Sequence, residues 1–152
     1  IGLRQTTTKY ALILNPDTSL SADTLKNFFE TASKYKDFSL IGPYSEEQKS
    51  VITKNNITEV ENIKGFAIFF NMNKFSEQKF FDENYFLYFE DIDLCRQVKK
   101  NNGKIYANLK LDKKRPKSNQ NQFGEGLGLY LGGVWGRLGP PLGAFGRLVA
   151  AF

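Results

Sequence analysis

Short apolar runs alternate with amphipathic stretches along residues 1–111. Runs of apolar and β-branched residues predict strands at residues 10–14, 38–41 and 65–70, and the alternation along residues 104–111 predicts a final strand. The run at residues 65–70, Gly-Phe-Ala-Ile-Phe-Phe, is rich in aromatic side chains, which favours a central strand. Strands that alternate with helical patterns are typical of an α/β domain, and we predict this fold class for residues 1–111.

Two segments have the three- and four-residue spacing of amphipathic helices. The first follows Ser21, a suitable N-cap, carries Asp23 in its first turn, and has its apolar positions at Leu25, Phe28, Phe29 and Ala32. The second runs from about residue 91 to 101, with Leu94, Cys95 and Val98 inward and Gly103 just beyond its end. Residues 45–62 lack a clear period and predict a loop.

The composition changes abruptly near residue 122. Residues 1–122 hold 16 Lys, 13 Asn and 9 Ile but 4 Gly, whereas residues 123–152 hold 9 Gly and no Lys, Asn or Ile. We therefore divide the chain into a domain (residues 1–111), a polar linker (112–122) and an irregular Gly-rich tail (123–152). Lys, Asn and Ile have AT-rich codons, whereas Gly, Ala, Pro and Arg have GC-rich codons. Because the composition switches from the first group to the second, we interpret the tail as a disordered or non-native segment, such as a fusion or frameshift product.

Charge and residue usage exclude several kinds of chemistry. The net charge is +5, from 21 Lys and Arg against 16 Asp and Glu, which suits a phosphate-bearing ligand or an acidic membrane surface. The absence of histidine excludes catalytic sites built on a His base, and the single Cys95 excludes an internal disulfide and predicts a reducing compartment. The chain starts at Ile1 without a secretory signal, and we expect that a segment precedes it.

The first candidate site is Asn15-Pro16-Asp17, directly after a predicted buried strand. Open α/β sheets bind their ligands at the carboxyl ends of strands, and one carboxylate with diphosphate oxygens can hold Mg²⁺. Asn-Pro-Asp is also a favourable turn sequence, and from the spacing alone this structural interpretation remains open.

The second candidate site is the segment of residues 81–93, which sets carboxylates among aromatic residues. A carboxylate partly removed from water becomes a better general base near neutral pH. The structural alternative is again open, because Glu90, Asp91 and Asp93 fall at the start of a helix, where acidic side chains favourably meet the helix dipole.

Three segments in this order resemble the second half of a family 2 glycosyltransferase of the rhamnosyltransferase-like branch. They are Tyr-Ala-Leu-Ile-Leu-Asn-Pro-Asp-Thr (residues 10–18), Lys-Gly-Phe-Ala-Ile-Phe-Phe (64–70) and Phe-Asp-Glu-Asn-Tyr-Phe-Leu-Tyr-Phe-Glu-Asp-Ile-Asp-Leu-Cys-Arg (81–96). The resemblance covers roughly residues 1–108, and the last segment is the most specific. It implies part of a GT-A fold, a nucleotide-diphospho-sugar transferase-like mixed sheet flanked by helices.

The resemblance also implies an activity and roles for individual residues. The family transfers a sugar with inversion from a nucleotide-sugar to an acceptor hydroxyl, usually with Mg²⁺ or Mn²⁺. Asn15-Pro16-Asp17 takes the place of the family's D-x-D motif, so Asn15 and Asp17 would bind the donor and Asp17 the metal. Asp91 would be the general base, Glu90 would orient the acceptor, and Gly65 would let the backbone approach the donor.

This chain departs from the family pattern in two places. It lacks the preceding strand-helix-strand unit that holds the nucleotide, and it lacks the histidine that the branch places after its last strand. We therefore expect an enzyme fragment, with or without activity of its own, that contributes to cell-surface polysaccharide synthesis with a sugar such as rhamnose.

We expect saccharide or lipid-linked acceptors, no nucleic-acid partner, and a cytoplasmic location, with contact to the inner face of the plasma membrane left open. The longest charge-free run of the tail, at residues 126–136, is too short to cross a bilayer. The alternative function is an inactive fragment or a non-catalytic module that binds carbohydrate or membrane.

Overall fold

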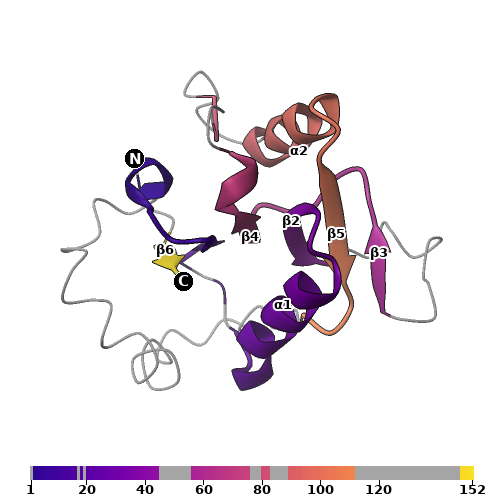
Figure 1. The fold of residues 1–152 in the computed structure, drawn as a ribbon. Helices are drawn as coiled ribbons and strands as arrows, with labels where there is room; N and C mark the ends of the chain where they lie inside the picture. The colour runs from indigo at the N-terminus through magenta and orange to yellow at the C-terminus, as the bar shows by residue number, and fades with distance from the viewer. Residues whose placement is uncertain are drawn as a thin grey trace.

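A computed structural model of the chain describes residues 2–16, 18, 20–44, 56–75, 80–82, 89–111 and 148–152. These residues form the α/β fold that the sequence predicts, with one mixed sheet and a helix on each face (Figure 1). The sheet has six strands in the order β3-β5-β2-β4-β1-β6. The strands are β1 (Tyr10–Leu14), β2 (Phe38–Pro43), β3 (Ile57–Glu59), β4 (Ala67–Asn71), β5 (Lys104–Asn108) and β6 (Leu148–Ala151).

Strand direction decides which ends of the elements meet. Strands β1, β2 and β5 run one way, because β4 is antiparallel to both β1 and β2, while β2 and β5 are parallel. Strands β3, β4 and β6 run the opposite way. The carboxyl ends of β1, β2 and β5 therefore share one edge of the sheet with the beginning of β4.

Both predicted helices are present, and α1 begins after the predicted N-cap, whereas α2 begins and ends one residue before the predicted positions. Helix α1 (Ala22–Lys34) follows Ser21 as its N-cap residue, and the Ser21 hydroxyl pairs with Thr24 Oγ1 at 2.8 Å. Helix α2 (Glu90–Lys100) ends in a Schellman motif, in which Asn102 has a φ of 57°. The N–H groups of Asn102 and Gly103 donate to the carbonyls of Lys99 and Val98 at 2.9 and 2.8 Å, and so satisfy the open carbonyls of the last turn.

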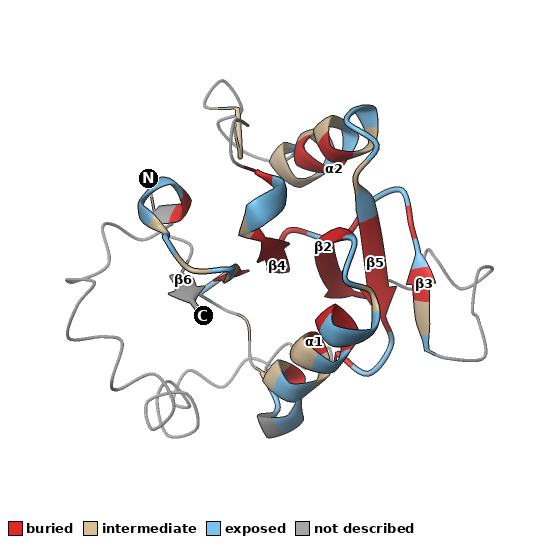
Figure 2. Cartoon of the chain, in the orientation of Figure 1, coloured by how far each residue is buried: buried red, intermediate tan, exposed pale blue. Residues whose placement is uncertain are grey.

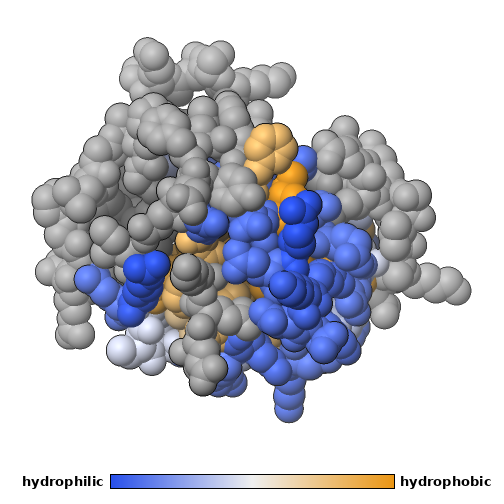
Figure 3. All heavy atoms as spheres, turned by 90° about the horizontal axis from the view of Figure 1, so that it is seen from above, coloured by the Kyte–Doolittle hydropathy of each residue, from blue (hydrophilic) through white to orange (hydrophobic). Residues whose placement is uncertain are grey.

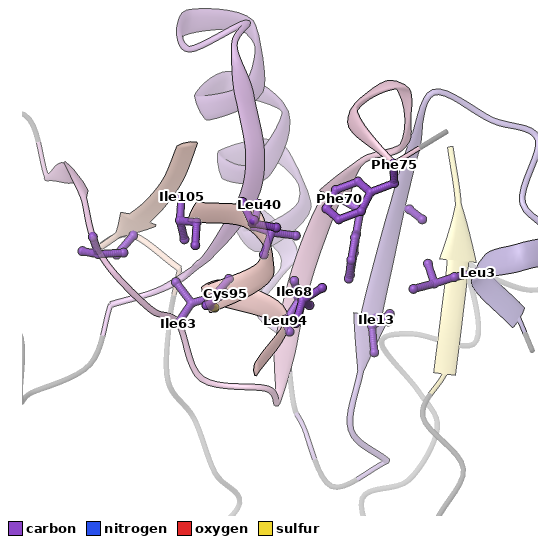
Figure 4. Packing of buried hydrophobic residues seen from close by; sticks show 14 of the residues in the cluster. Leu3, Ile13, Leu40, Ile63, Ile68, Phe70, Phe75, Leu94, Cys95 and Ile105 are labelled. Carbon is purple, nitrogen blue, oxygen red and sulfur yellow. The ribbon is translucent and has the colours of Figure 1, made fainter. Parts of the chain in front are cut away.

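Both faces of the sheet are buried, one under each helix. In Figure 2 the buried residues line the strands and the inner sides of the helices, while exposed residues lie on the outer sides. Leu94, Cys95 and Val98 of α2 join the core of the first face, and Phe28 and Ala32 of α1 join that of the second. Figure 4 shows the first core, where side chains of β1, β2, β4 and β5 meet those of α2.

A bulge in β2 changes which face of the sheet its side chains occupy. The register between β2 and β5 shifts between Phe38 and Leu40. As a result Phe38 and Ile41 belong to the same core, although strict alternation would place them on opposite faces.

Several predicted boundaries are wrong for identifiable reasons. Residues 57–59, which we assigned to a loop, form the edge strand β3 on β5, and three residues are too few for a periodic signal. Strand β2 continues through Gly42 and Pro43, because a proline without N–H is tolerated at a strand end. Strand β5 is buried on both faces instead of alternating, and it ends at Asn108, whose side chain accepts from the Lys110 N–H in a turn.

The chain end also differs from the prediction. Residues 148–151, part of the predicted irregular tail, form β6 on the outer side of β1, and Phe152 packs against Phe29 at a ring-centroid distance of 5.5 Å. The linker and the rest of the Gly-rich tail lie outside the described residues. Within the described parts of the chain, neither α1, α2 nor the short 3₁₀ helices η1 (Gly2–Gln5) and η3 (Met72–Lys74) has the length and apolar character to span a membrane.

Candidate functional site

The candidate residues gather at the sheet edge where β1, β2 and β5 end. Helix α2 leads directly into β5 and runs back along it, so α2 begins at this same edge. Leu14, the last residue of β1, is opposite Ala67, the first residue of β4. The edge therefore carries the turn after β1, the residues that precede β4 and the first turn of α2.

The turn after β1 is fixed to the residue that precedes β4. The Asn15 N–H donates to the Phe66 carbonyl at 2.9 Å, and the Thr18 hydroxyl donates to the same carbonyl at 3.1 Å. The Thr18 N–H closes the turn on the Asn15 carbonyl at 3.0 Å. Strand β4 starts at Ala67 and not at Gly65 as predicted, and the bond between Asn15 and Phe66 continues its pairing with β1 by one residue.

Asp91 joins the beginning of α2 to the same segment. Its Oδ2 accepts a hydrogen bond from the Gly65 N–H at 2.8 Å, across 26 residues of sequence, and its Oδ1 accepts from the Ile92 N–H at 2.8 Å. Asp91 is half-buried, so it is still reachable from solvent. Each carboxylate oxygen has two acceptor positions, and Asp91 can therefore accept a further bond from a ligand hydroxyl.

Residues 65 and 66 are thus the centre of the arrangement. The Gly65 N–H donates to Asp91. The Phe66 carbonyl accepts from Asn15 and Thr18 in the turn after β1. The structure brings together Asn15, Gly65 and Asp91 of the predicted site residues.

The remaining predicted site residues are Glu90 and Asp17, together with the aromatic and acidic segment that precedes α2. Glu90 is the first residue of α2 and is half-buried, with its Oε2 atom inaccessible to solvent. Asp17, and residues 83–88 of the aromatic and acidic segment, lie outside the described residues. Phe81 packs against Phe70 of the first core at a centroid distance of 6.5 Å, as an ordinary core residue would.

The described side chains do not by themselves form a multidentate metal site. Within the ranges that the structure describes, His, Cys, Asp and Glu side chains nowhere gather in groups of three that could hold a metal ion. A Mg²⁺ or Mn²⁺ ion held by one carboxylate and two phosphate groups needs no such group. The donor set at residues 15–17, an amide and a carboxylate, is chemically suitable for these ions.

A tight contact beneath α2 holds the residues that precede Gly65. A Cβ atom added to Gly42 would lie 2.9 Å from the Cβ and Cδ1 atoms of Ile63, so Ile63 packs directly on the β2 backbone. Figure 4 shows Ile63 beside Cys95 of α2. Burial raises the pKa of Cys95 to about 11, and the nearby Asp91 charge acts in the same direction, while a hydrogen bond with the Ile63 backbone opposes both. Cys95 is thus a neutral thiol that packs in the core.

Three residues of this region were not predicted from the sequence. Thr18 follows Asn-Pro-Asp and its hydroxyl could have been recognised as a turn donor. Tyr44 follows β2 at the same edge, and its buried hydroxyl has no hydrogen-bond partner among the described residues. Phe89, the N-cap residue of α2, has a φ of 67° and is 63% exposed, and no local sequence signal indicates either property.

Comparison of the chain with protein-family models, with curated proteins and with solved structures gives no match.

Proposed function

We propose that this chain is part of an inverting glycosyltransferase that uses a nucleotide-sugar donor, with Asp91 as the general base. The observation that carries the proposal is the hydrogen bond from the Gly65 N–H to Asp91 Oδ2, beside the Phe66 carbonyl that holds the turn at Asn15. The three segments on which the resemblance rests thus meet at one sheet edge, the usual ligand-binding edge of an α/β sheet. This meeting supports a partial GT-A fold.

The described geometry suits proton removal by Asp91. Two backbone N–H groups, those of Gly65 and Ile92, hold one oxygen each and so fix the orientation of the carboxylate. An acceptor hydroxyl would donate to a remaining acceptor position of Asp91 and transfer its proton there while the oxygen attacks the anomeric carbon of the donor sugar. The bond from that carbon to the diphosphate breaks, and the nucleotide diphosphate leaves with the electron pair.

The donor would lie at the turn after β1. We assign Asn15 and Asp17 to the donor diphosphate, Gly65 to close backbone approach, and Glu90 to orientation of the acceptor. Asp17 would hold Mg²⁺ or Mn²⁺, which when bound neutralises charge that develops on the leaving diphosphate. The turn itself is set by Thr18 and Phe66, whose hydrogen bond holds it against β4.

Substitution of Asp91 tests the proposed function. In the proposed parent glycosyltransferase, Asp91→Asn should abolish sugar transfer from UDP- or dTDP-sugars, because the amide cannot accept the proton. Binding of UDP and dTDP should stay nearly intact in the same variant. Turnover close to that of the unsubstituted protein would refute Asp91 as the base.

The proposal extends to the biological setting. A sugar donor such as dTDP-rhamnose and a saccharide or lipid-linked acceptor would place the reaction in cell-surface polysaccharide synthesis, on the cytoplasmic side of the plasma membrane. Saccharide binding that needs neither nucleotide nor metal would favour the alternative, a non-catalytic carbohydrate-binding module.

A further inference from the structure

The turn between α2 and β5 contains a chemically reactive pair of residues. Asn102-Gly103 is the only Asn-Gly pair in the chain, and every other asparagine precedes a residue with a side chain. A backbone nitrogen can attack the side-chain carbonyl carbon of the asparagine before it, and glycine favours this attack because it has no Cβ to hinder it. Asn102 is exposed to water. Figure 3 views the molecule from the side on which α2 lies in Figure 1, and the described surface there is largely hydrophilic.

The fold holds the attacking nitrogen in a hydrogen bond. The Gly103 N–H donates to the Val98 carbonyl at 2.8 Å as part of the Schellman motif that ends α2. Gly103 is also tightly packed, because a Cβ atom added there would lie 2.6 Å from both Ser39 Oγ and Val98 Cγ1. The Gly103 N–H must leave this bond before its nitrogen can lose the proton and attack.

We infer that Asn102 is a site of spontaneous deamidation and that the end of α2 controls its rate. When the helix end opens, the Gly103 N–H passes its proton to a hydroxide ion, and the nitrogen forms a bond to Asn102 Cγ. The bond from Cγ to the side-chain nitrogen breaks, and ammonia leaves with that electron pair and a proton from water. One water molecule then opens the succinimide ring to aspartate or isoaspartate. The reaction needs only water and is independent of the proposed function.

Both products weaken the junction between α2 and β5. Isoaspartate puts an extra methylene group into the backbone, so the bonds from the Asn102 and Gly103 N–H groups to the helix end cannot both keep their present geometry. Aspartate adds a negative charge where the helix dipole is negative and where Asp37 lines the same small pocket. Modification of Asn102 should therefore lower the thermal midpoint of unfolding.

The test compares the full chain in mildly alkaline buffer with the same chain unfolded in urea. Mass spectrometry of proteolytic fragments follows the conversion of amide to acid at each asparagine. Asn101 is the internal control, because it lies beside Asn102 but precedes a residue with a side chain. We expect conversion at Asn102 to be faster than at Asn101 in both states, and about tenfold slower in the folded chain than in the unfolded chain. Asn102→Gly, which tolerates the φ of 57°, should abolish the conversion and keep the fold.

Hydrogen exchange tests the control by the helix end. Val98→Ala removes the methyl group that packs on Gly103, and it should accelerate exchange of the Gly103 amide and conversion of Asn102 by the same factor, because both need the same opening. In the unsubstituted chain the two rates should likewise rise together as urea is added. The inference is overturned if Asn102 is converted no faster than Asn101, if the folded and unfolded chains convert it at equal rates, or if conversion and Gly103 exchange respond differently to urea.

Discussion

The hydrogen bond from Gly65 to Asp91 can be measured apart from any catalytic role. Asp91→Asn keeps the size of the side chain but turns one of the two accepting oxygens into a donor, so one of the bonds from Gly65 and Ile92 is lost. A hydrogen bond to a charged group contributes about 1.5–3 kcal/mol, and removal of the negative charge from the first helical turn adds about 0.3–1 kcal/mol. Because Asp91 is only half-buried, we expect a destabilisation of about 1–2 kcal/mol in urea unfolding.

Asp93→Asn is the matched control for this substitution. Asp93 lies in the same first turn of α2, and its side chain accepts from Gln97 within the helix instead of from Gly65. Asp93→Asn should therefore show the helix-dipole effect and a weaker bond from Gln97, while the bond from Gly65 to Asp91 stays intact. Hydrogen exchange of the Gly65 amide should accelerate about tenfold in Asp91→Asn relative to Asp93→Asn, which corresponds to about 1.4 kcal/mol. Equal stabilities of the two variants together with unchanged Gly65 exchange would refute the bond.

Three further substitutions test the surroundings of the site. Gly42→Ala should destabilise the fold by about 1–3 kcal/mol in urea unfolding and shift the Gly65 amide signal, because the new Cβ displaces Ile63; an unchanged midpoint would contradict this packing. Tyr44→Phe should stabilise the chain by about 1 kcal/mol, because it removes a buried hydroxyl without a described partner, and a loss of stability would show that the hydroxyl is satisfied. Burial raises the pKa of Cys95 from 9.0 to about 11, so the folded state holds the thiol proton more tightly than the unfolded state. The resulting contribution to the free energy of unfolding is fully present below pH 9, and about 2–3 kcal/mol of it is lost as the pH rises to 11. Cys95→Ala should remove that part of the pH dependence, and an unchanged slope of stability between pH 9 and 11 would contradict it.

Local sequence patterns predicted the elements that depend on short-range features, such as apolar runs, amphipathic faces and helix ends. Strand β1 is a continuous apolar run ended by a turn, and α1 and α2 have clear apolar faces and recognisable ends. The pattern failed where pairing across the sheet decides the structure. Strand β3 has three residues and depends on β5, and the β2 bulge that brings Phe38 and Ile41 to one face depends on the register with β5.

The site could be anticipated only in part for the same reason. Gly65 and Asp91 are far apart in sequence, and only the resemblance suggested that they act together. The Phe66 carbonyl as the acceptor for Asn15 and Thr18 depends on how β4 begins, which no local pattern specifies. The left-handed backbone of Phe89 could not be anticipated either, because bulky aromatic residues rarely adopt this conformation.

The most direct test of a sugar-transfer site at this edge is paramagnetic NMR of the labelled full chain with UDP or dTDP and Mn²⁺. We predict that Mn²⁺ with nucleotide broadens the amide signals of Asn15, Thr18 and Gly65, and that Asp17→Ala prevents the broadening. Broadening confined to other parts of the chain, or none with either nucleotide, would contradict a donor diphosphate site at the turn after β1.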